Sequence, residues 1–233
     1  MSRFIAVIIF IFVLIGCSSI PSELRESGAI VVAECNSDTS KIGGDYGVVY
    51  LSIENSAMAH DWYFKLNSQP NKEYIVDLPI SKISIPRLSD GGGFRSKARV
   101  ACYQLTAGEY EISHLIGKLT GNAGRSSLRE YTFSQKIIVT KGSALYLGRY
   151  VVYDAETRGK GYFRTAGTSF KKMFSLKSLL PNEIIVDNID KYSEDNVWLR
   201  ENHKSLNDWN EVLAIRKIDK LPSAQTYNKT NKH

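Results

Sequence analysis

Four histidines are the first candidates for acid–base or metal chemistry: His60, His114, His203 and His233. No two of them form an H-x-x-x-H pair and no two cysteines form a C-x-x-C pair, so the common zinc signatures are missing. The G-x-S-x-G elbow of many serine hydrolases is missing as well. The sequence therefore predicts no catalytic residue, no metal ligand and no cofactor-binding residue.

Two histidines have simpler structural interpretations. His114 shares the alternating phase of Tyr110 and Ile112, which predicts a hydrogen-bonded side chain at the edge of the core. His203 stands near the expected end of a helix, where a basic side chain suits the helix dipole.

Two polar segments could bind ions. Residues 91–97 (GGGFRSK) could present backbone amides and two cations to an anion, but they lack the spacing of a P-loop, which favours a flexible loop. The acids Asp187, Asp190, Glu194 and Asp195 lack the spacing of an EF-hand calcium loop. We expect them to form the solvated start of a helix.

Cys17 is the strongest candidate for covalent chemistry, in the form of lipid attachment. It ends the stretch Leu-Ile-Gly-Cys, which closes an apolar run, Phe4–Ile15, behind Arg3. Those twelve residues would make a helix of about 18 Å, too short for about 30 Å of hydrocarbon. The pattern resembles a bacterial lipoprotein signal, which implies cleavage between Gly16 and Cys17.

The resemblance also implies a location. Cys17 would carry a thioether-linked diacylglycerol and usually a third acyl chain, and two or more chains anchor a protein stably. Ser18, rather than Asp, after the lipidated cysteine resembles outer-membrane sorting. We therefore expect a lipid-anchored protein of the cell envelope, in the outer membrane and facing the periplasm. The alternative is an ordinary secretory signal in which Cys17 is incidental.

The other two cysteines, Cys35 and Cys102, are an even pair in an exported chain. A disulfide between them would close a loop of about 67 residues and stabilise the fold by about 4 kcal/mol. The alternative is two separate buried thiols that act as small hydrophobes.

The composition suits a single globular domain with an appendage. The chain has 233 residues, of which 217 remain after loss of 16, with 43% hydrophobic and 23% charged residues. The formal charge of +6 falls to +5 once Arg3 leaves, and the basic residues are scattered. No basic block is long enough to predict nucleic-acid binding.

Alternating apolar and polar residues predict a series of short strands separated by Gly-rich turns. In residues 47–55, for example, Val49, Leu51 and Ile53 share one face. The expected strands are Gly28–Glu34, Gly47–Asn55, Trp62–Leu66, Lys97–Leu105, Glu109–Leu115, Glu130–Thr140 and Ala144–Tyr153. This spacing predicts a mainly β fold, an antiparallel β-sandwich with a small C-terminal helical appendage.

One part of this pattern carries a family resemblance. Residues 105–112 (LTAGEYEI) contain an Ala-Gly-x-Tyr turn, and a later strand pair joined at Gly142 ends in Tyr-Leu-Gly, at residues 146–148. Together with Phe133 and Ile137–Val139, this resembles uncharacterised bacterial lipoproteins with a transthyretin-like or carboxypeptidase-regulatory-like β-sandwich domain. The resemblance implies a fold and is silent on activity.

The expected organisation has five parts: a signal peptide at 1–16, a lipidated tether at 17–27, a β-sandwich at 28–166, an α-containing appendage at 167–220 and a disordered tail at 221–233. In the appendage, Ser193 would cap a helix that ends near Lys204. Its apolar residues Trp198, Leu206 and Trp209 would dock on the sandwich, and residues 212–218 could form a strand instead of a helical turn.

These observations predict a lipid-anchored, non-enzymatic module that binds or braces another component of the bacterial envelope. Its partners would be the membrane, through the lipid, and an envelope protein or glycan. Two alternatives remain open: an envelope hydrolase whose catalytic groups come from separate loops, and an accessory lipoprotein of a secretion apparatus, which rests on fold analogy.

Overall fold

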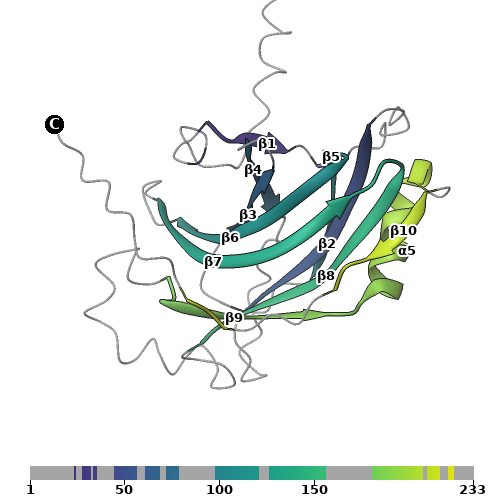
Figure 1. Ribbon diagram of the computed structural model, residues 1–233. Coiled ribbons are helices and arrows are strands. Elements are labelled where there is room, and N and C mark those ends of the chain that lie inside the picture. Colours follow the sequence, from purple (N-terminus) through teal and green to yellow (C-terminus); the bar gives the residue numbers. More distant parts are fainter. Residues whose placement is uncertain are drawn as a thin grey trace, which may run out of the picture.

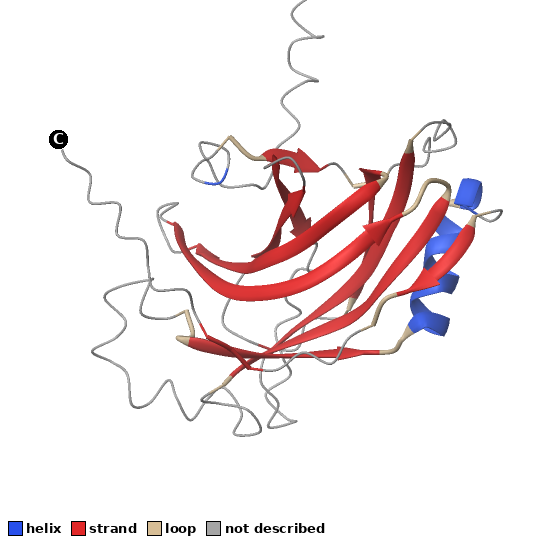
Figure 2. Ribbon diagram, in the orientation of Figure 1, coloured by secondary structure: helices blue, strands red, loops and turns tan. Residues whose placement is uncertain are grey.

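Two β-sheets pack against each other, and one helix lies on the outside of the second sheet (Figures 1 and 2). The computed structural model describes residues 24, 28–32, 34–35, 45–56, 61–68, 72–78, 98–120, 126–155, 180–206, 209–215 and 220–222. The predicted fold class, mainly β and sandwich-like with a short helix near the C-terminus, is confirmed.

The first sheet, here called sheet A, has five strands. In spatial order they are β1 (Ile30–Val32), β4 (Lys72–Leu78), β3 (Asp61–Ser68), β6 (Gly108–Thr120) and β7 (Ser126–Val139). Only the β1–β4 pair among them is parallel.

The second sheet, sheet B, has six strands. The path runs β11 (Lys220–Pro222), β9 (Glu183–Ile189), β8 (Ser143–Asp154), β2 (Tyr46–Ser56) and β5 (Arg99–Thr106), and β10 (Asn210–Leu213) pairs with the first residues of β8. β8 is parallel to both β2 and β10. Both sheets are therefore mixed, where the strand pattern alone led us to expect antiparallel pairing.

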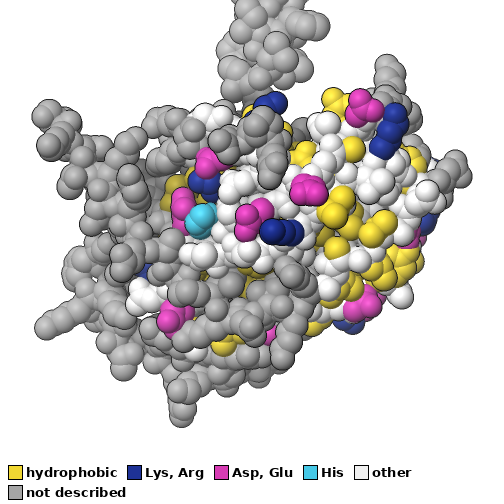
Figure 3. Space-filling model, in the orientation of Figure 1, with side chains coloured by type: hydrophobic (Ala, Val, Ile, Leu, Met, Phe, Trp, Pro, Cys, Tyr) yellow, Lys and Arg dark blue, Asp and Glu magenta, His cyan; other side chains and the backbone are white. Residues whose placement is uncertain are grey.

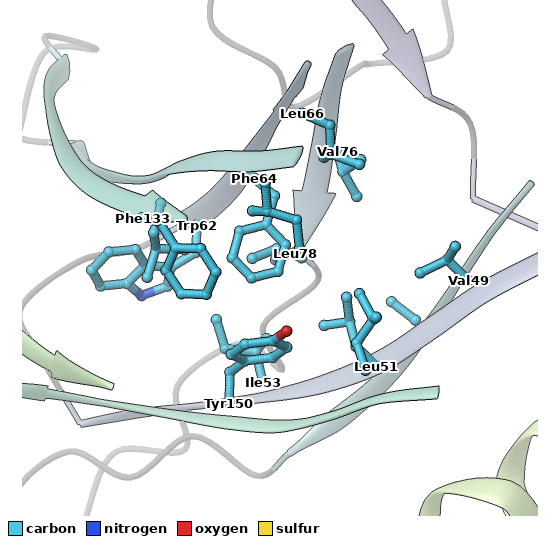
Figure 4. Close-up of a cluster of buried hydrophobic side chains, with 14 of the residues drawn as sticks. Val49, Leu51, Ile53, Trp62, Phe64, Leu66, Val76, Leu78, Phe133 and Tyr150 are labelled. Atoms are coloured by element: carbon cyan, nitrogen blue, oxygen red, sulfur yellow. The ribbon is translucent and has the colours of Figure 1, made fainter. Parts of the chain in front are cut away.

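The core lies between the sheets and follows the predicted alternation. Val49, Leu51 and Ile53 of β2 face β3 residues Trp62 and Phe64, and all five are at most 3% exposed (Figure 4). Aromatic rings connect the layers, because the Phe64 ring lies 5.1 Å from Tyr150 of β8 and 5.6 Å from Phe133 of β7, centroid to centroid. Such contacts add to the stabilisation from apolar burial.

The turn at Lys141–Gly142 carries the chain from sheet A to sheet B. Gly142 has a φ of +68°, in the left-handed region that favours glycine, as the turn requires. Gly47 lies beside this turn, and a Cβ there would stand 2.5 Å from the Thr140 carbonyl oxygen. A larger residue at position 47 would push the two sheets apart at this corner.

The helix α5 (Tyr192–Asn202) is followed by a short 3-10 turn, Lys204–Leu206. The sequence predicts Ser193 as the cap of this helix, but Ser193 lies inside the helix and Lys191 holds the N-cap position. The Asp190 carboxylate accepts a hydrogen bond from the Tyr192 amide at 2.9 Å. At its end, the His203 amide donates to the Leu199 carbonyl. No helix within the described ranges is long and apolar enough to cross a bilayer.

The C-terminal segment supplies sheet strands as well as a helix. β9, β10 and β11 all belong to sheet B, and Ile184 and Val186 of β9 are buried in the main core. The expected signal peptide, Cys17 and the expected boundary at residue 167 lie outside the described residues. The predicted disordered tail, 221–233, is wrong at its start, because Leu221 and Pro222 pair with β9 in β11, and its remainder also lies outside the described residues. Leu24, expected in the tether, is buried against Tyr63, Ile75 and Ile116 on the outer face of sheet A.

Candidate functional site

The carboxylate of Asp195 is the centre of a polar cluster between α5 and sheet B. Asp195 is only 1% exposed. One oxygen, Oδ2, accepts hydrogen bonds from the Ser52 hydroxyl at 2.6 Å and from the Tyr146 hydroxyl at 2.7 Å. The other, Oδ1, accepts from Nη2 of Arg149 at 2.5 Å. A buried charge is tolerated only when it is paired and hydrogen-bonded, and Asp195 is both.

An irregularity in β8 brings two of these donors to the same face. Side chains alternate along a strand, so Tyr146 and Arg149, three residues apart, would normally lie on opposite faces. The β2–β8 register shifts here, because Tyr50 is opposite Tyr146 while Ser52 is opposite Arg149. The extra residue on β8 is a β-bulge that turns Arg149 towards α5.

Gly148 makes this bulge possible. Its φ of +97° lies in the region that disfavours other residues, and a Cβ there would stand 1.9 Å from Oδ1 of Asn188. Asn188, on β9, donates from Nδ2 to the Leu147 carbonyl oxygen at 2.8 Å. β9 therefore closes over the backbone of the bulge.

Arg149 joins the cluster into one network. Its Nε donates to the Ser52 hydroxyl oxygen at 3.0 Å, and its Nη2 lies 3.1 Å from Oε2 of Glu194 as well as contacting Asp195. Burial alone would lower the pKa of Arg149, but the Asp195 carboxylate raises the pKa overall. Arg149 is therefore held as a cation.

The two tyrosines beside the cluster are held neutral, and Tyr146 is the one that donates to Asp195. Burial raises the pKa of Tyr146 far above its ordinary value, and the hydrogen bond to Asp195 raises it further. Burial also raises the pKa of Tyr50, whose ring lies 4.9 Å from that of Tyr146, centroid to centroid. Neither phenol is prepared to act as a base near neutral pH.

The geometry indicates a clamp for the helix α5. The clamp consists of the side chains that bond one another between α5 and sheet B: Ser52, Tyr146, Arg149 and Asp195. The Ser52 hydroxyl donates to the Asp195 carboxylate and accepts from the Arg149 guanidinium, so it bridges the helix and the two strands of sheet B. The apolar flank consists of Leu199 and Leu206, which pack against Val48 and Val100 on the outer face of sheet B. Trp198 and Trp209 pack at its margin, as the sequence predicts.

A second ion pair fixes α5 to β10. The Arg200 guanidinium contacts the Glu211 carboxylate, and Nδ2 of Asn196 lies 3.5 Å from the other oxygen of Glu211. Because β10 also pairs with β8, the helix and this edge strand hold each other on sheet B.

A shallow concavity lies at another place, where β4 begins and the β5–β6 turn ends. Its volume is about 330 Å³, at the low end for small-molecule sites. Lys72, Tyr74, Glu109 and Tyr110 are among its lining residues. The Tyr110 hydroxyl donates to the Thr106 carbonyl at 2.8 Å, and burial raises the pKa of Tyr110. The concavity thus offers charged groups of both signs, Lys72 and Glu109.

The cysteine pair is bonded. Cys35 and Cys102 form a disulfide with 5.3 Å between their Cα atoms, and the Cys35 amide donates to the Cys102 carbonyl at 2.7 Å. Of the two sequence-based alternatives, the structure has the disulfide. It ties the segment after β1 to β5, beneath the apolar flank of the clamp.

The structure corrects two interpretations of ionisable residues. His114 is half-buried and its Nδ1 lies 3.1 Å from the Ser113 hydroxyl, but a register shift after Ile112 turns it to the outer face of sheet A, away from Tyr110 and Ile112. Asp195 belongs to the clamp, not to a solvated helix start, because its helix face lies on the sheet.

The remaining residues that the sequence suggested for chemistry lie apart from the Asp195 network or outside the described residues. His203 is buried at the end of α5, with its ring 5.9 Å from that of Trp198. His60, His233 and residues 91–97 lie outside the described residues. Within the described ranges, no group of three or more His, Cys, Asp or Glu side chains could hold a metal ion.

The Asp195 cluster was missed because its members are distant in sequence, and Ser52 and Asp195 are 143 residues apart. The available signal was the alternation of β8: Leu145 and Leu147 share one phase, whereas Tyr150 and Val152 share the other, with Gly148 between them. That change of phase at a glycine predicts a bulge.

No protein-family model, no curated protein and no solved structure matches the chain.

Proposed function

We propose that the protein is a lipid-anchored β-sandwich of the bacterial cell envelope that binds or braces another envelope component. It is anchored through acyl chains on Cys17 and faces the periplasm from the outer membrane. Its partner is an envelope protein or glycan, and its role is non-enzymatic.

The observation that carries the proposal is the combination of the Leu-Ile-Gly-Cys stretch with the Cys35–Cys102 disulfide. Structural disulfides persist in exported proteins and are rare in the reducing cytosol. The two features are independent, since one concerns a short signal and the other a bond within the folded domain, and both favour the same compartment.

Leu24 adds a spatial argument for membrane proximity. It is buried on the outer face of sheet A, only seven residues after Cys17. Seven extended residues reach at most about 25 Å. A lipid on Cys17 would therefore keep this face of the sandwich near the bilayer, and the partner would have to approach the membrane surface.

The family resemblance is the finer part of the proposal. In the transthyretin-like or carboxypeptidase-regulatory-like pattern, the Ala-Gly-x-Tyr turn starts a strand whose aromatic residue points inward. Here β6 starts at Gly108, and both Tyr110 and Ile112 are in the core. The inward position of Tyr110 and Ile112 is what that pattern requires. On this ground we propose that the domain is of the transthyretin-like or carboxypeptidase-regulatory-like type.

The non-enzymatic role is supported by how the buried polar groups are used. Ser52, Tyr146, Arg149 and Asp195 bond one another between α5 and sheet B, and these bonds hold the helix. A rigid sandwich with a clamped helix suits a binding or bracing module.

Metabolic labelling tests the anchor. Cells that express the chain are grown with an alkyne analogue of palmitate, and the protein is isolated and reacted with a fluorescent azide. We expect label on the wild type, no label on Cys17→Ala, and accumulation of that variant as a precursor. Cys35→Ala together with Cys102→Ala is the matched control and should keep the label. A wild-type protein without label contradicts the proposal.

A further inference from the structure

β7 is the last strand of sheet A, and within the described part of the chain only β6 pairs with it. It is 14 residues long. On its inner side, Tyr131 donates to the Pro181 carbonyl and Gln135 donates to the Ala214 carbonyl. These bonds to the opposite layer come from inward side chains, and β11 of sheet B also lies close to β7. Within the described residues, the ladder partner of β7 is β6 on one side, and its other side is the edge of sheet A. A long edge strand of this kind is a ready site for pairing with another chain.

The outward side chains of β7 have a self-complementary order. Thr132, Ser134, Lys136 and Ile138 are exposed, and Glu130 is half-buried. Figure 3 shows acidic and basic side chains together on this face, over β6 and β7. A strand with both signs of charge can attract a second copy of itself in antiparallel orientation.

The charges select one register. When the two Phe133 residues lie at the two-fold axis, Glu130 stands opposite Lys136 of the second copy, and the symmetry produces this pair twice. In the same register, Thr132 stands opposite Ser134 and the half-buried Leu128 stands opposite Ile138. Every outward position from 128 to 138 therefore meets a compatible partner.

The neighbouring registers lose this match. A shift of two residues in one direction places Lys136 opposite Thr132 and Glu130 opposite Ile138. The opposite shift places Lys136 opposite Leu128 and Glu130 opposite Ser134. Because a shift of one residue would exchange the faces of the strand, the Phe133-centred register is the favoured one.

We propose that two copies of the protein pair antiparallel through β7, in the register centred on Phe133, to form one continuous ten-stranded sheet. The two-fold axis then stands perpendicular to the sheet, so the outer faces of both copies point to the same side. Leu24 of each copy lies on that side. If Cys17 is lipidated, as proposed above, both anchors can enter the same membrane, which raises the effective concentration of one copy for the other.

Charge reversal tests the pairing. The full chain is extracted in detergent, and its self-association is measured by analytical ultracentrifugation. We expect the wild type to be dimeric. Lys136→Glu places two like-charged pairs across the axis and should weaken dimerisation by about tenfold or more. The double variant Glu130→Lys with Lys136→Glu restores opposite charges and should recover the dimer.

Two matched controls make the same charge changes on the outside of sheet B. Glu201→Lys alters an exposed residue at the end of α5, and Lys204→Glu alters one in the 3-10 turn that follows. Both should leave dimerisation unchanged. Circular dichroism establishes that each variant is folded. A monomeric wild type, or a double variant no better than Lys136→Glu, overturns the proposal; Lys136 would then be a charge that protects the edge from pairing.

Cysteine crosslinking tests the register. Two tagged copies, one with Glu130→Cys and one with Lys136→Cys, are expressed together and oxidised in intact cells. The proposal predicts a mixed disulfide, because these positions are directly opposite. Each variant expressed alone should give none, because identical positions lie six residues apart along the strands, about 20 Å. No mixed product, or equal products in all three cultures, overturns the register. Palmitate labelling is read separately, so failure of the anchor and failure of the pairing are distinguishable.

Discussion

The guanidinium of Arg149 on β8 and the carboxylate of Asp195 on α5 meet at 2.5 Å, between Nη2 and Oδ1, although 46 residues separate them in sequence. This contact exists because the bulge at Gly148 turns Arg149 to the outer face of sheet B. The exposed fractions of the two side chains are 14% and 1%. The pair therefore joins the helix to the sheet in a largely dry environment.

Substitution of Asp195 should measure the strength of the clamp. Asp195→Asn keeps the shape of the side chain but removes the charge that Arg149 faces. Loss of one member of a buried pair leaves the other uncompensated, so we expect the free energy of unfolding to fall by about 2–4 kcal/mol. Urea denaturation followed by circular dichroism checks this value.

The neighbouring Glu194 provides the matched control, since it also contacts Arg149 but its side chain is 57% exposed. Glu194→Gln should cost clearly less than Asp195→Asn, because exposed ion pairs contribute little to stability. Equal losses in the two variants would show that burial of Asp195 does not set the strength of the clamp.

The bulge itself can be tested at Gly148. Gly148→Ala places a methyl group 1.9 Å from Oδ1 of Asn188 at a φ of +97°. The backbone at residue 148 is then strained, and the Asn188 side chain must leave the position from which it donates to the Leu147 carbonyl. We expect a loss above about 2 kcal/mol by thermal or urea unfolding. Gly142 also has a positive φ, +68°, but no atom lies within 4 Å of a carbon added there. Gly142→Ala should therefore lower the free energy of unfolding by only about 1 kcal/mol. A larger loss at Gly142 would contradict this account of the bulge.

The strands that pack the core could be predicted because each shows regular alternation. Val49, Leu51 and Ile53 of β2 are buried on one face as expected, and so are Trp62 and Phe64 of β3. Here a period of two residues is sufficient, since every second side chain enters the same core.

Irregular strands and distant contacts could not be predicted in the same way. One additional residue reverses the phase of a strand, and this happens in β6 after Ile112, relative to β3, and in β8 near Gly148, relative to β2. The sequence pattern therefore predicts the wrong face of the sheet for His114. It gives no indication that Arg149 belongs to a polar cluster. β10 and β11 are short edge strands, and their pairing depends on β8 and β9, which lie elsewhere in the sequence.

The disulfide predicts a specific labelling result. In protein that is unfolded without reductant, neither Cys35 nor Cys102 should react with a thiol reagent, and both should react after reduction. Replacement of both by alanine should lower the free energy of unfolding by about 4 kcal/mol, since the bond closes a long loop in the unfolded chain. Two reactive thiols before reduction would contradict the bond.

His114 predicts a pH dependence of stability. Burial lowers the pKa of its imidazole below the ordinary value, and the nearby Glu130 opposes part of this effect. The folded state therefore disfavours the protonated form, and stability should fall as the pH drops below about 6.5. His114→Gln should reduce the loss of stability between pH 7 and pH 5, measured by urea unfolding. An unchanged loss in the variant would contradict the assignment.

The most direct test of the lipid-anchored account is mass spectrometry of the mature N-terminus. The protein is isolated from membranes, digested, and its N-terminal peptide identified. The account predicts that the first residue is Cys17, that it carries a diacylglyceryl group on sulfur and an acyl group on its amine, and that no peptide spans Gly16 and Cys17. A peptide that contains the intact Gly16–Cys17 bond, or a mature chain in which Cys17 is an unmodified thiol, would contradict it.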